Sequence, residues 1–320
     1  MAGRRRKKSG GRSYAWRYRG RIVACVFVEV IIICALVIMI GWNKGVKEWF
    51  EQFEQPVLKE VDISGINSPN AILMQARGGK ILGEINGEAQ IYPASMTKIM
   101  TVILGIENFD DLDEKITLTD EMFTGLYEQD ATQAGFQPGE EVRVIDLLYG
   151  AMLPSGAECC IALADTISGS EADFAELMNK KARKLGMENT HFCDSTGLHN
   201  PDHYSTVKDI AVLMKYCIKN DTFREIVETS RHSTGVTNIH PDGITYYSTM
   251  FKNLSAPTVT GGKILGGKTG YTSEAGHCLV SFAEIEGREY IFVSAGASGA
   301  DGNTIPHIQD AVTVYNRVGA

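Results

Sequence analysis

The stretch YPASMTKIM, residues 92–100, places a serine and a lysine three residues apart at the expected start of a helix. On a helix, Ser95 and Lys98 therefore share one face. A serine hydroxyl becomes a good nucleophile only when a base takes its proton. A lysine serves as that base only when burial and neighbouring cations lower its pKa. The pair therefore predicts either an ordinary polar helix face or the nucleophile and base of an enzyme.

The Ser-x-x-Lys pattern alone is weak, because this chain contains it twice. The second match is Ser205-Thr206-Val207-Lys208. Thr206 with Asp209 there resembles a capping box, although Glu or Gln is the usual partner. The second match is thus explained as a helix start, and other segments must decide what Ser95 does.

Two further segments carry residues suited to the same chemistry. LPSGAE, residues 153–158, places Ser155 on a turn before an apolar helix, as a helix cap or a second catalytic hydroxyl. GGKTGYT, residues 266–272, places Lys268 and Thr269 on a strand whose glycines would let a substrate backbone approach closely. This lysine and threonine suit a substrate carboxylate, by charge and by hydrogen bond. Taken alone, the segment also fits the end of a hairpin strand.

The first 56 residues differ from the rest in composition. Residues 1–21 carry nine basic and no acidic residues. The whole chain has a net charge of −8, so the remaining residues sum to −17. Residues 22–40 hold a single charge, Glu29, and as a helix span about 28 Å, close to the hydrocarbon thickness of a bilayer. Because a cleaved signal peptide has a shorter apolar run, we expect a transmembrane anchor at 22–41.

The positive-inside rule orients this anchor. It predicts a basic cytoplasmic arm at 1–21, which contacts anionic lipid headgroups rather than nucleic acid, and an extracytoplasmic remainder at the cell membrane. Residues 42–56 place two tryptophans and two phenylalanines on one helical face. They predict an interfacial or stalk helix, or a helix packed on the domain. Glu29 marks either a partner helix or a tolerated, protonated residue.

The remaining residues, 57–320, predict an α+β domain. The segment 71–85 predicts two short strands around a Gly78-Gly79 turn. A helix follows from about Ser95, and four later segments show apolar residues at helical spacing: 141–153, 156–168, 171–186 and 205–220. From about residue 257 the pattern changes to strands, and 305–318 predicts a closing helix. The expected fold is one antiparallel sheet formed by both ends of the domain, with a helical insertion.

Five cysteines lie beyond the anchor: Cys159, Cys160, Cys193, Cys217 and Cys278. Their spacing matches no zinc framework, and a domain of this size folds without staples. Buried free thiols and one disulfide are both compatible with the sequence.

The three motifs occur in an order and in a context that resemble a known family. Ser95-x-x-Lys98, Ser155-x-x and Lys268-Thr269-Gly270 match the set found in penicillin-binding proteins and class A β-lactamases. The similarity extends over about residues 62–320, through DLLYGAMLPSGAE, FAELMNKKARKLGMENTHF and GGKTGYTSEAGHCLVSFA. The chain resembles serine D-alanyl-D-alanine carboxypeptidases, the low-molecular-mass penicillin-binding proteins. This resemblance implies a β-lactamase/D,D-peptidase-like fold, with the active site between an α/β half and a helical half.

The resemblance also implies a role for each motif residue. Ser95 would form the acyl-enzyme, Lys98 would act as its base, and Ser155 would relay a proton. Lys268 and Thr269 would bind the terminal carboxylate of the substrate. Backbone N–H groups of Ser95 and of Tyr271, which follows Gly270, would form the oxyanion hole.

This chain departs from the family pattern at two places. Ala157 stands where the family usually has asparagine, so no side-chain amide reaches Lys98 or the substrate; Glu158 or a water is the expected replacement. A lost hydrogen bond of this kind costs about 1–3 kcal/mol when its partner stays buried, which predicts a slower enzyme. DSTGL, residues 194–198, replaces the usual Asn-Pro before Gly-Leu, where we expect only a loop difference.

The predicted function is a membrane-anchored, penicillin-sensitive serine carboxypeptidase that removes the terminal D-alanine from peptidoglycan stem pentapeptides and binds β-lactams covalently, without a cofactor or metal. One alternative is a catalytically weak wall-peptide or β-lactam binding protein, marked by Ala157. A β-lactamase is another, although no Glu-x-x-Leu-Asn follows Ser155. His199 and His203 have the spacing of metal ligands, but Pro201 between them argues against a helix that would align them. The balance between hydrolysis and transpeptidation is left open by the sequence.

Overall fold

The structure, a computed structural model, describes three stretches of the chain: residues 59–254, 256–299 and 305–320. Three predicted segments lie outside them: the basic arm (1–21), the transmembrane anchor (22–41) and the stalk helix (42–56). Within the three described stretches, no helix is long and apolar enough to cross a bilayer.

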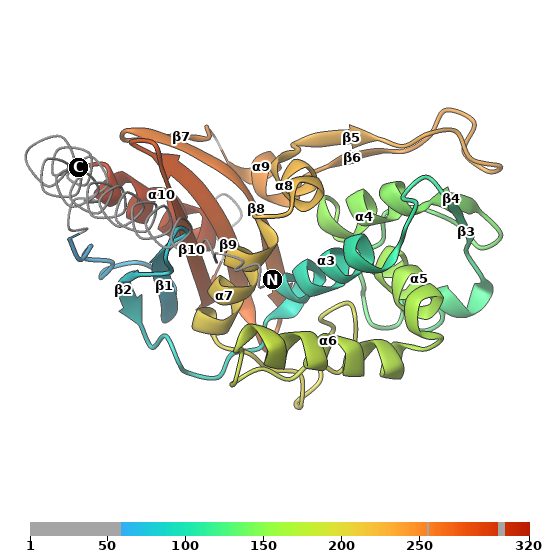
Figure 1. Cartoon of the computed structure of the whole chain (residues 1–320), viewed down its shortest axis with the longest axis horizontal. Coiled ribbons are helices and arrows are strands. Elements are labelled where there is room, and N and C mark those ends of the chain that lie inside the picture. Colours follow the sequence, from blue (N-terminus) through green and yellow to red (C-terminus); the bar gives the residue numbers. More distant parts are fainter. Residues whose placement is uncertain (1–58, 255, 300–304) are drawn as a thin grey trace, which may run out of the picture. The chain divides into compact units, whose positions relative to one another are not determined.

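A six-stranded antiparallel sheet lies at the centre of the folded unit (Figure 1). Its strand order is β2 (Ile81–Ile85), β1 (Asn70–Gln75), β10 (Arg288–Ala297), β9 (Gly276–Ile285), β8 (Gly262–Thr272) and β7 (Thr258–Val259). Because β1 pairs with β10, the two ends of the domain meet inside one sheet. The predicted sheet, formed by both ends around a helical insertion, is confirmed.

The predicted turn at Gly78 and Gly79 is confirmed. The two glycines lie in the loop between β1 and β2 and have φ of +85° and +74°. Glu286 and Gly287 form a two-residue turn between β9 and β10, with φ of +51° and +71°. Two-residue hairpin turns of this kind need positive φ at both positions, which glycine adopts without steric cost.

The insertion between β2 and β7 is mainly helical. Its helices are α3 (Lys98–Asn108), α4 (Val144–Met152), α5 (Ala157–Ser168), α6 (Glu171–Leu185), α7 (Val207–Cys217), α8 (Asp221–Glu228) and the short α9 (Thr249–Asn253). α3 lies among α4, α5 and α6 (Figure 1), and its first eight residues are all buried. A helix that is apolar on every side is stable only inside a core. α3 is thus the fixed centre of the helical part, and a 3-10 turn, η1 (Ala94–Thr97), leads into it.

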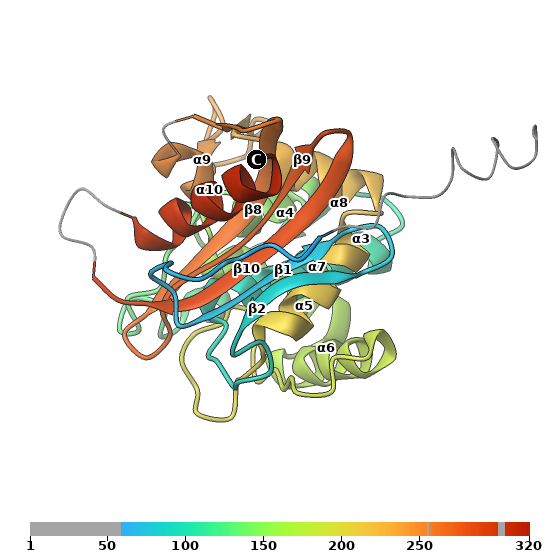
Figure 2. The ribbon, with the colours of Figure 1, turned by 90° about the vertical axis from the view of Figure 1, so that its left-hand side faces the viewer.

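Helices cover both faces of the sheet (Figure 2). α10 (Pro306–Val318) is the closing helix that the sequence predicts, and it packs on β9 and β10 from one side. α7, α8 and η1 contact the other side, toward the helical insertion. η1 and β8 are therefore in direct contact, which brings residues near 95 and near 270 together.

Two small two-stranded sheets were not evident from the sequence. β3 (Lys115–Thr117) pairs with β4 (Glu141–Arg143), and β5 (Arg231–Ser233) pairs with β6 (Thr245–Tyr247). The first three residues of the helix expected at 141–153 thus form a strand instead. Each of these strands has three residues, too few for an alternating pattern to be recognised.

All five cysteines within the described residues are free thiols. Cys159, Cys160, Cys217 and Cys278 are buried, and Cys193 is partly exposed. Of the two alternatives left open by the sequence, the structure has free thiols and no disulfide among these five.

Asp310 joins the first and last parts of the domain. Its carboxylate, on α10, accepts hydrogen bonds from the backbone and side chain of both Asn67 and Ser68, at 2.6–2.9 Å. Asp310 is 1% exposed. A buried carboxylate that accepts four bonds leaves several donors unpaired when it is removed.

We expect Asp310→Ala to lower the free energy of unfolding by about 3 kcal/mol, because it leaves these buried donors unsatisfied. Urea unfolding of residues 57–320, followed by circular dichroism, measures this loss. Gln309→Ala is the control, since Gln309 is an exposed neighbour on the same helix. Equal stability of the two variants would contradict the assigned role.

Candidate active site

Ser95 and Lys98 lie on consecutive turns of the chain. Ser95 is in η1, and Lys98 is the first residue of α3. Nζ of Lys98 lies 3.0 Å from Oγ of Ser95. This is hydrogen-bond distance, so the arrangement lets an uncharged lysine take the serine proton.

Lys98 lies in an environment that disfavours its charged form. Its side chain is 3% exposed. Burial lowers the pKa of Lys98 below its usual 10.5, and this effect outweighs the opposing influence of Cys160, Asp194 and Glu158. A lysine whose ammonium form is destabilised in this way is suited to act as a general base near neutral pH.

The second partner of Lys98 is a backbone group. Nζ donates to the carbonyl oxygen of Thr196 at 2.6 Å. The side chain of Ala157, which replaces the usual asparagine, offers no polar group. Glu158 does not replace it either: its Oε1 accepts from the backbone N–H groups of Ala134 and Gly135 at 2.6 and 2.9 Å, and its Oε2 is buried without a hydrogen-bond partner. Of the replacements for the missing amide, the structure uses a main-chain carbonyl that the sequence did not indicate.

Ser155 and Lys268 form a second lysine–hydroxyl pair. Nζ of Lys268 donates to Oγ of Ser155 at 3.0 Å and to its neighbour's carbonyl, that of Thr269, at 2.8 Å. Lys268 is 1% exposed, and burial, with a further contribution from Lys98, lowers its pKa well below the usual value. Ser155 has φ of +75° on the turn before α5, a strained conformation for a residue with a Cβ.

A cavity of about 1280 Å³ opens over these residues. Ser95, Ser155, Thr269, Gly270 and Tyr271 all line it, together with Thr132 and Thr249. Lys98 and Lys268 are buried, and each donates to a serine that lines the cavity. Oγ1 of Thr269 is paired with Oγ1 of Thr249 at 2.7 Å on the cavity wall.

Gly270 allows β8 to lie against the nucleophile. A Cβ at this position would be 3.0 Å from the backbone N of Ser95 and 3.1 Å from Cβ of Ala94. The N–H groups in the first turn of a helix have no intrahelical partner. The close approach therefore leaves the Ser95 N–H beside β8, the strand that carries Tyr271, where the sequence predicts an oxyanion hole.

The second Ser-x-x-Lys match has a different environment. Oγ of Ser205 is bonded to Oγ1 of Thr190 at 2.8 Å. Lys208 is partly exposed and forms an ion pair with Glu88. Serine and lysine thus point to different partners, and this pair lacks the geometry of a nucleophile and its base.

The two histidines with metal-ligand spacing are also separated. His203 is buried and bonded to Asp194 and Thr97. His199 contacts the ring of Tyr92 edge-on. No group of three potential ligands capable of holding a metal ion occurs in residues 59–254, 256–299 and 305–320.

The seven residues that the sequence singled out thus lie together. Lys98 and Lys268 are buried and bonded to Ser95 and Ser155, and these two serines line the cavity together with Thr269, Gly270 and Tyr271. The contact of Thr196 with Lys98 could not be predicted from the sequence, because a backbone carbonyl carries no side-chain signal. Asp194 was not predicted as a site residue either, although the departure from the usual Asn-Pro pattern marked that position.

Comparison with known proteins gives the same relationship from sequence and from structure. The family model described as D-alanyl-D-alanine carboxypeptidase matches residues 57–299. D-alanyl-D-alanine carboxypeptidase DacF of Bacillus subtilis (strain 168) is 35% identical over 231 residues, which cover 72% of this chain and 57% of that protein. The chain therefore spans little more than half the length of this relative.

Streptomyces proteins match both in sequence and in structure. The D-alanyl-D-alanine carboxypeptidase of Streptomyces sp. (strain K15) is 37% identical over 205 residues, 62% of this chain and 69% of that one. The crystal structure of the Streptomyces K15 DD-transpeptidase superimposes with a TM-score of 0.71 at 28% identity. It covers 81% of this chain and 99% of that chain, so the sheet and its helices share one arrangement.

The steric fit of Gly197 against η1 can be tested. A Cβ at Gly197, where φ is +79°, would lie 1.9 Å from the carbonyl oxygen of Ala94, the residue before Ser95. We expect Gly197→Ala to lower the free energy of unfolding by about 3 kcal/mol or more, because the clash is with main chain, and to slow acylation of Ser95. Urea unfolding and penicillin labelling measure the two effects.

Gly186→Ala is the matched control. Gly186 ends α6 with φ of +81°, and a Cβ there would meet nothing within 4 Å. It should lose only the left-handed penalty, about 1 kcal/mol, and keep normal labelling. Equal losses in the two variants would show that contact with η1 is unimportant.

Proposed function

This chain belongs to the D-alanyl-D-alanine carboxypeptidase family of serine penicillin-binding proteins, and we propose that it removes the terminal D-alanine from peptidoglycan stem pentapeptides. The predicted family is confirmed, and so is the β-lactamase/D,D-peptidase-like fold. The activity and substrate are inferred from the site, since the chain spans only part of its relatives.

One observation carries the proposal. Oγ of Ser95 lies 3.0 Å from a lysine amine that is buried beneath the cavity. Burial lowers the pKa of Lys98, which favours the neutral amine that can accept a proton. A nucleophile with its base in place, opening into a cavity that can admit a peptide, supports acyl transfer.

In the first step, the lysine takes the proton of Ser95 as Oγ attacks the carbonyl carbon of the penultimate D-alanine. Backbone N–H groups of Ser95 and Tyr271 stabilise the resulting oxyanion. The C–N bond then breaks, and the amine of the leaving D-alanine receives a proton through Lys98 or Ser155. Water hydrolyses the acyl-enzyme in the second step, with the same base accepting its proton.

Substrate recognition involves the strand beside the nucleophile. An extended peptide lies along β8, where Gly270 leaves room for its backbone. The hydroxyl pair of Thr269 and Thr249 faces the cavity and donates to the terminal carboxylate. Lys268 acts indirectly, by holding Oγ of Ser155 in place.

Two considerations favour an active enzyme over a weak binding protein. Thr196 supplies Lys98 with the second hydrogen-bond partner that Ala157 cannot provide. The cavity also exposes Ser95 to a ligand. Ser95 attacks β-lactams in the same way and forms an ester with them, so we propose that they are covalent inhibitors. Transfer of the acyl group to an amine instead of water remains compatible with this site.

We further propose that the domain is held at the outer face of the cell membrane. The support is sequence alone: the apolar run at 22–40 and the nine basic residues before it. This arrangement would keep the catalytic domain beside the peptidoglycan layer, with residues 42–56 as the connection.

The nucleophile can be identified directly. We expect fluorescent penicillin to label the wild-type protein, and Ser95→Ala to abolish labelling and D-alanine release from a pentapeptide, because the substitution removes the cavity-lining hydroxyl that lies 3.0 Å from Nζ of Lys98. Ser205→Ala is the control, since it removes the serine of the second Ser-x-x-Lys match and should keep both activities. Labelling of the Ser95→Ala protein would exclude this nucleophile.

The membrane anchor predicts a difference between two forms of the protein. The full chain should sediment with membranes and resist extraction by salt, whereas residues 57–320 should stay in the soluble fraction, because only the first carries the apolar run. Ultracentrifugation with immunoblotting measures this. Release of the full chain by salt alone would indicate peripheral binding instead.

A further inference from the structure

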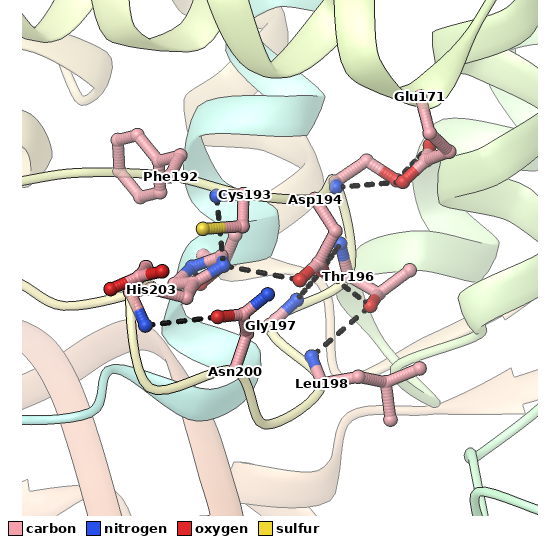
Figure 3. A network of polar contacts seen from close by, with 12 residues as sticks. Glu171, Phe192, Cys193, Asp194, Thr196, Gly197, Leu198, Asn200 and His203 are labelled. Atoms are coloured by element: carbon pink, nitrogen blue, oxygen red, sulfur yellow. Dashed lines mark hydrogen bonds and ion pairs between the residues drawn. The ribbon is translucent and has the colours of Figure 1, made fainter.

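A carboxylate organises the turn that contacts Lys98 (Figure 3). Oδ1 of Asp194 accepts hydrogen bonds from the backbone N and Oγ1 of Thr196, at 2.8 and 2.7 Å, and from the backbone N of Gly197 at 2.7 Å. Glu171 fixes the same turn from α6, by accepting from the backbone N and Oγ of Ser195. The carbonyl of Thr196, 2.6 Å from Nζ of Lys98, is therefore held on both sides.

The other oxygen of Asp194 connects this turn to η1. Oδ2 lies 3.1 Å from Nδ1 of His203, and Nε2 of His203 lies 2.9 Å from Oγ1 of Thr97. His203 is 2% exposed. The backbone N of Cys193 also lies 3.2 Å from Nδ1, but one nitrogen cannot donate and accept at once. The ionised Asp194 decides the tautomer: Nδ1–H donates to Oδ2, and Nε2 accepts from Thr97.

Asp194 carries a negative charge near Lys98 that persists to low pH. Burial alone would raise the pKa of Asp194, but hydrogen bonds from His203 and Thr196 hold it at about 2. Burial raises the pKa of Glu158 and raises that of Cys160 to about 12. The thiol is therefore uncharged at neutral pH, whereas Asp194 stays ionised wherever the enzyme works.

We propose that Asp194 is a positioning residue for acylation of Ser95: its carboxylate sets the Thr196 carbonyl against Lys98, and its charge sets the pH at which Lys98 becomes a base. The inference rests on the proposed function. In this proposal the two departures from the family pattern are linked. Ala157 removes a side-chain amide from Lys98, and the turn beginning at Asp194 provides the replacement.

The sign of the charge effect follows from chemistry. Lys98 works as the neutral amine, so the rate of acylation rises with pH as Lys98 loses its proton. A nearby negative charge favours the ammonium form and moves this rise to higher pH. The ionisable groups that face Lys98 are Asp194 from the loop, Glu158, Cys159 and Cys160 from α5, and Lys268 from β8. Those that face Asp194 are His203, Glu171 and Cys193.

The test compares Asp194→Asn with the wild type. The second-order rate constant for acylation by fluorescent penicillin is measured across pH on the full chain. Asn keeps the size of the side chain but removes its charge. We expect the acid limb of the profile to move to lower pH, and the plateau to fall about tenfold because the turn is held less firmly. Thermal unfolding shows whether the variant is folded.

Asp202→Asn is the matched control. It removes one carboxylate from the same loop, at an exposed position with no contact to Lys98, and should keep the wild-type profile. His203→Gln should lower the plateau without moving the acid limb, because it leaves the charge of Asp194 in place. Asp194→Glu keeps the charge, so its acid limb should stay at the wild-type position. This variant keeps the charge effect testable if Asp194→Asn does not fold.

The outcomes separate this inference from the proposed function. If wild-type protein is not acylated at Ser95, the proposed function fails. If wild type is acylated but Asp194→Asn and Asp202→Asn give one profile, only the role of Asp194 is wrong. A lower plateau with an unmoved acid limb in Asp194→Asn would show a merely structural carboxylate and would overturn the charge effect.

Discussion

The burial of Lys98 is the constraint on which the site depends. An ammonium group removed from water is costly unless it is paired with a charge or loses its proton. Here the amine meets two neutral oxygens, Oγ of Ser95 and the carbonyl of Thr196. Burial in this environment favours the neutral amine over the ammonium form, and so lowers the pKa of Lys98. The same burial that would destabilise an ordinary lysine therefore creates a base.

The fold makes this burial possible. α3 starts at Lys98 and is enclosed by the helical insertion, so the lysine cannot swing out to solvent. β8 crosses in front of η1, and Gly270 lets it approach the nucleophile without a clash. β8 comes from the C-terminal part of the domain, whereas η1 follows the N-terminal strands β1 and β2. Both ends of the domain are therefore needed to form the site. Asp310, which ties α10 to the first described residues, contributes to the same closure.

Much of this could be predicted from the sequence, for definite reasons. Hydrophobic periodicity located the long helices, and the three motifs located Ser95, Ser155 and Lys268. The two small sheets escaped because three residues carry no period. The second partner of Lys98 escaped because a carbonyl belongs to every residue, and its position depends on the turn held by Asp194. The bond between Nζ of Lys268 and Oγ of Ser155 escaped because the two residues lie 113 positions apart in the sequence.

The central claim is that burial lowers the pKa of Lys98 and so favours the neutral form that acts as the base. The titration of Lys98 is followed most directly by NMR of the lysine Cε–Hε signals of residues 57–320, with the Lys98 signal assigned by its loss in Lys98→Arg. The account predicts that this signal titrates with a pKa clearly below the usual 10.5, because burial lowers it. A Lys98 signal that titrates together with the exposed lysines would contradict the account.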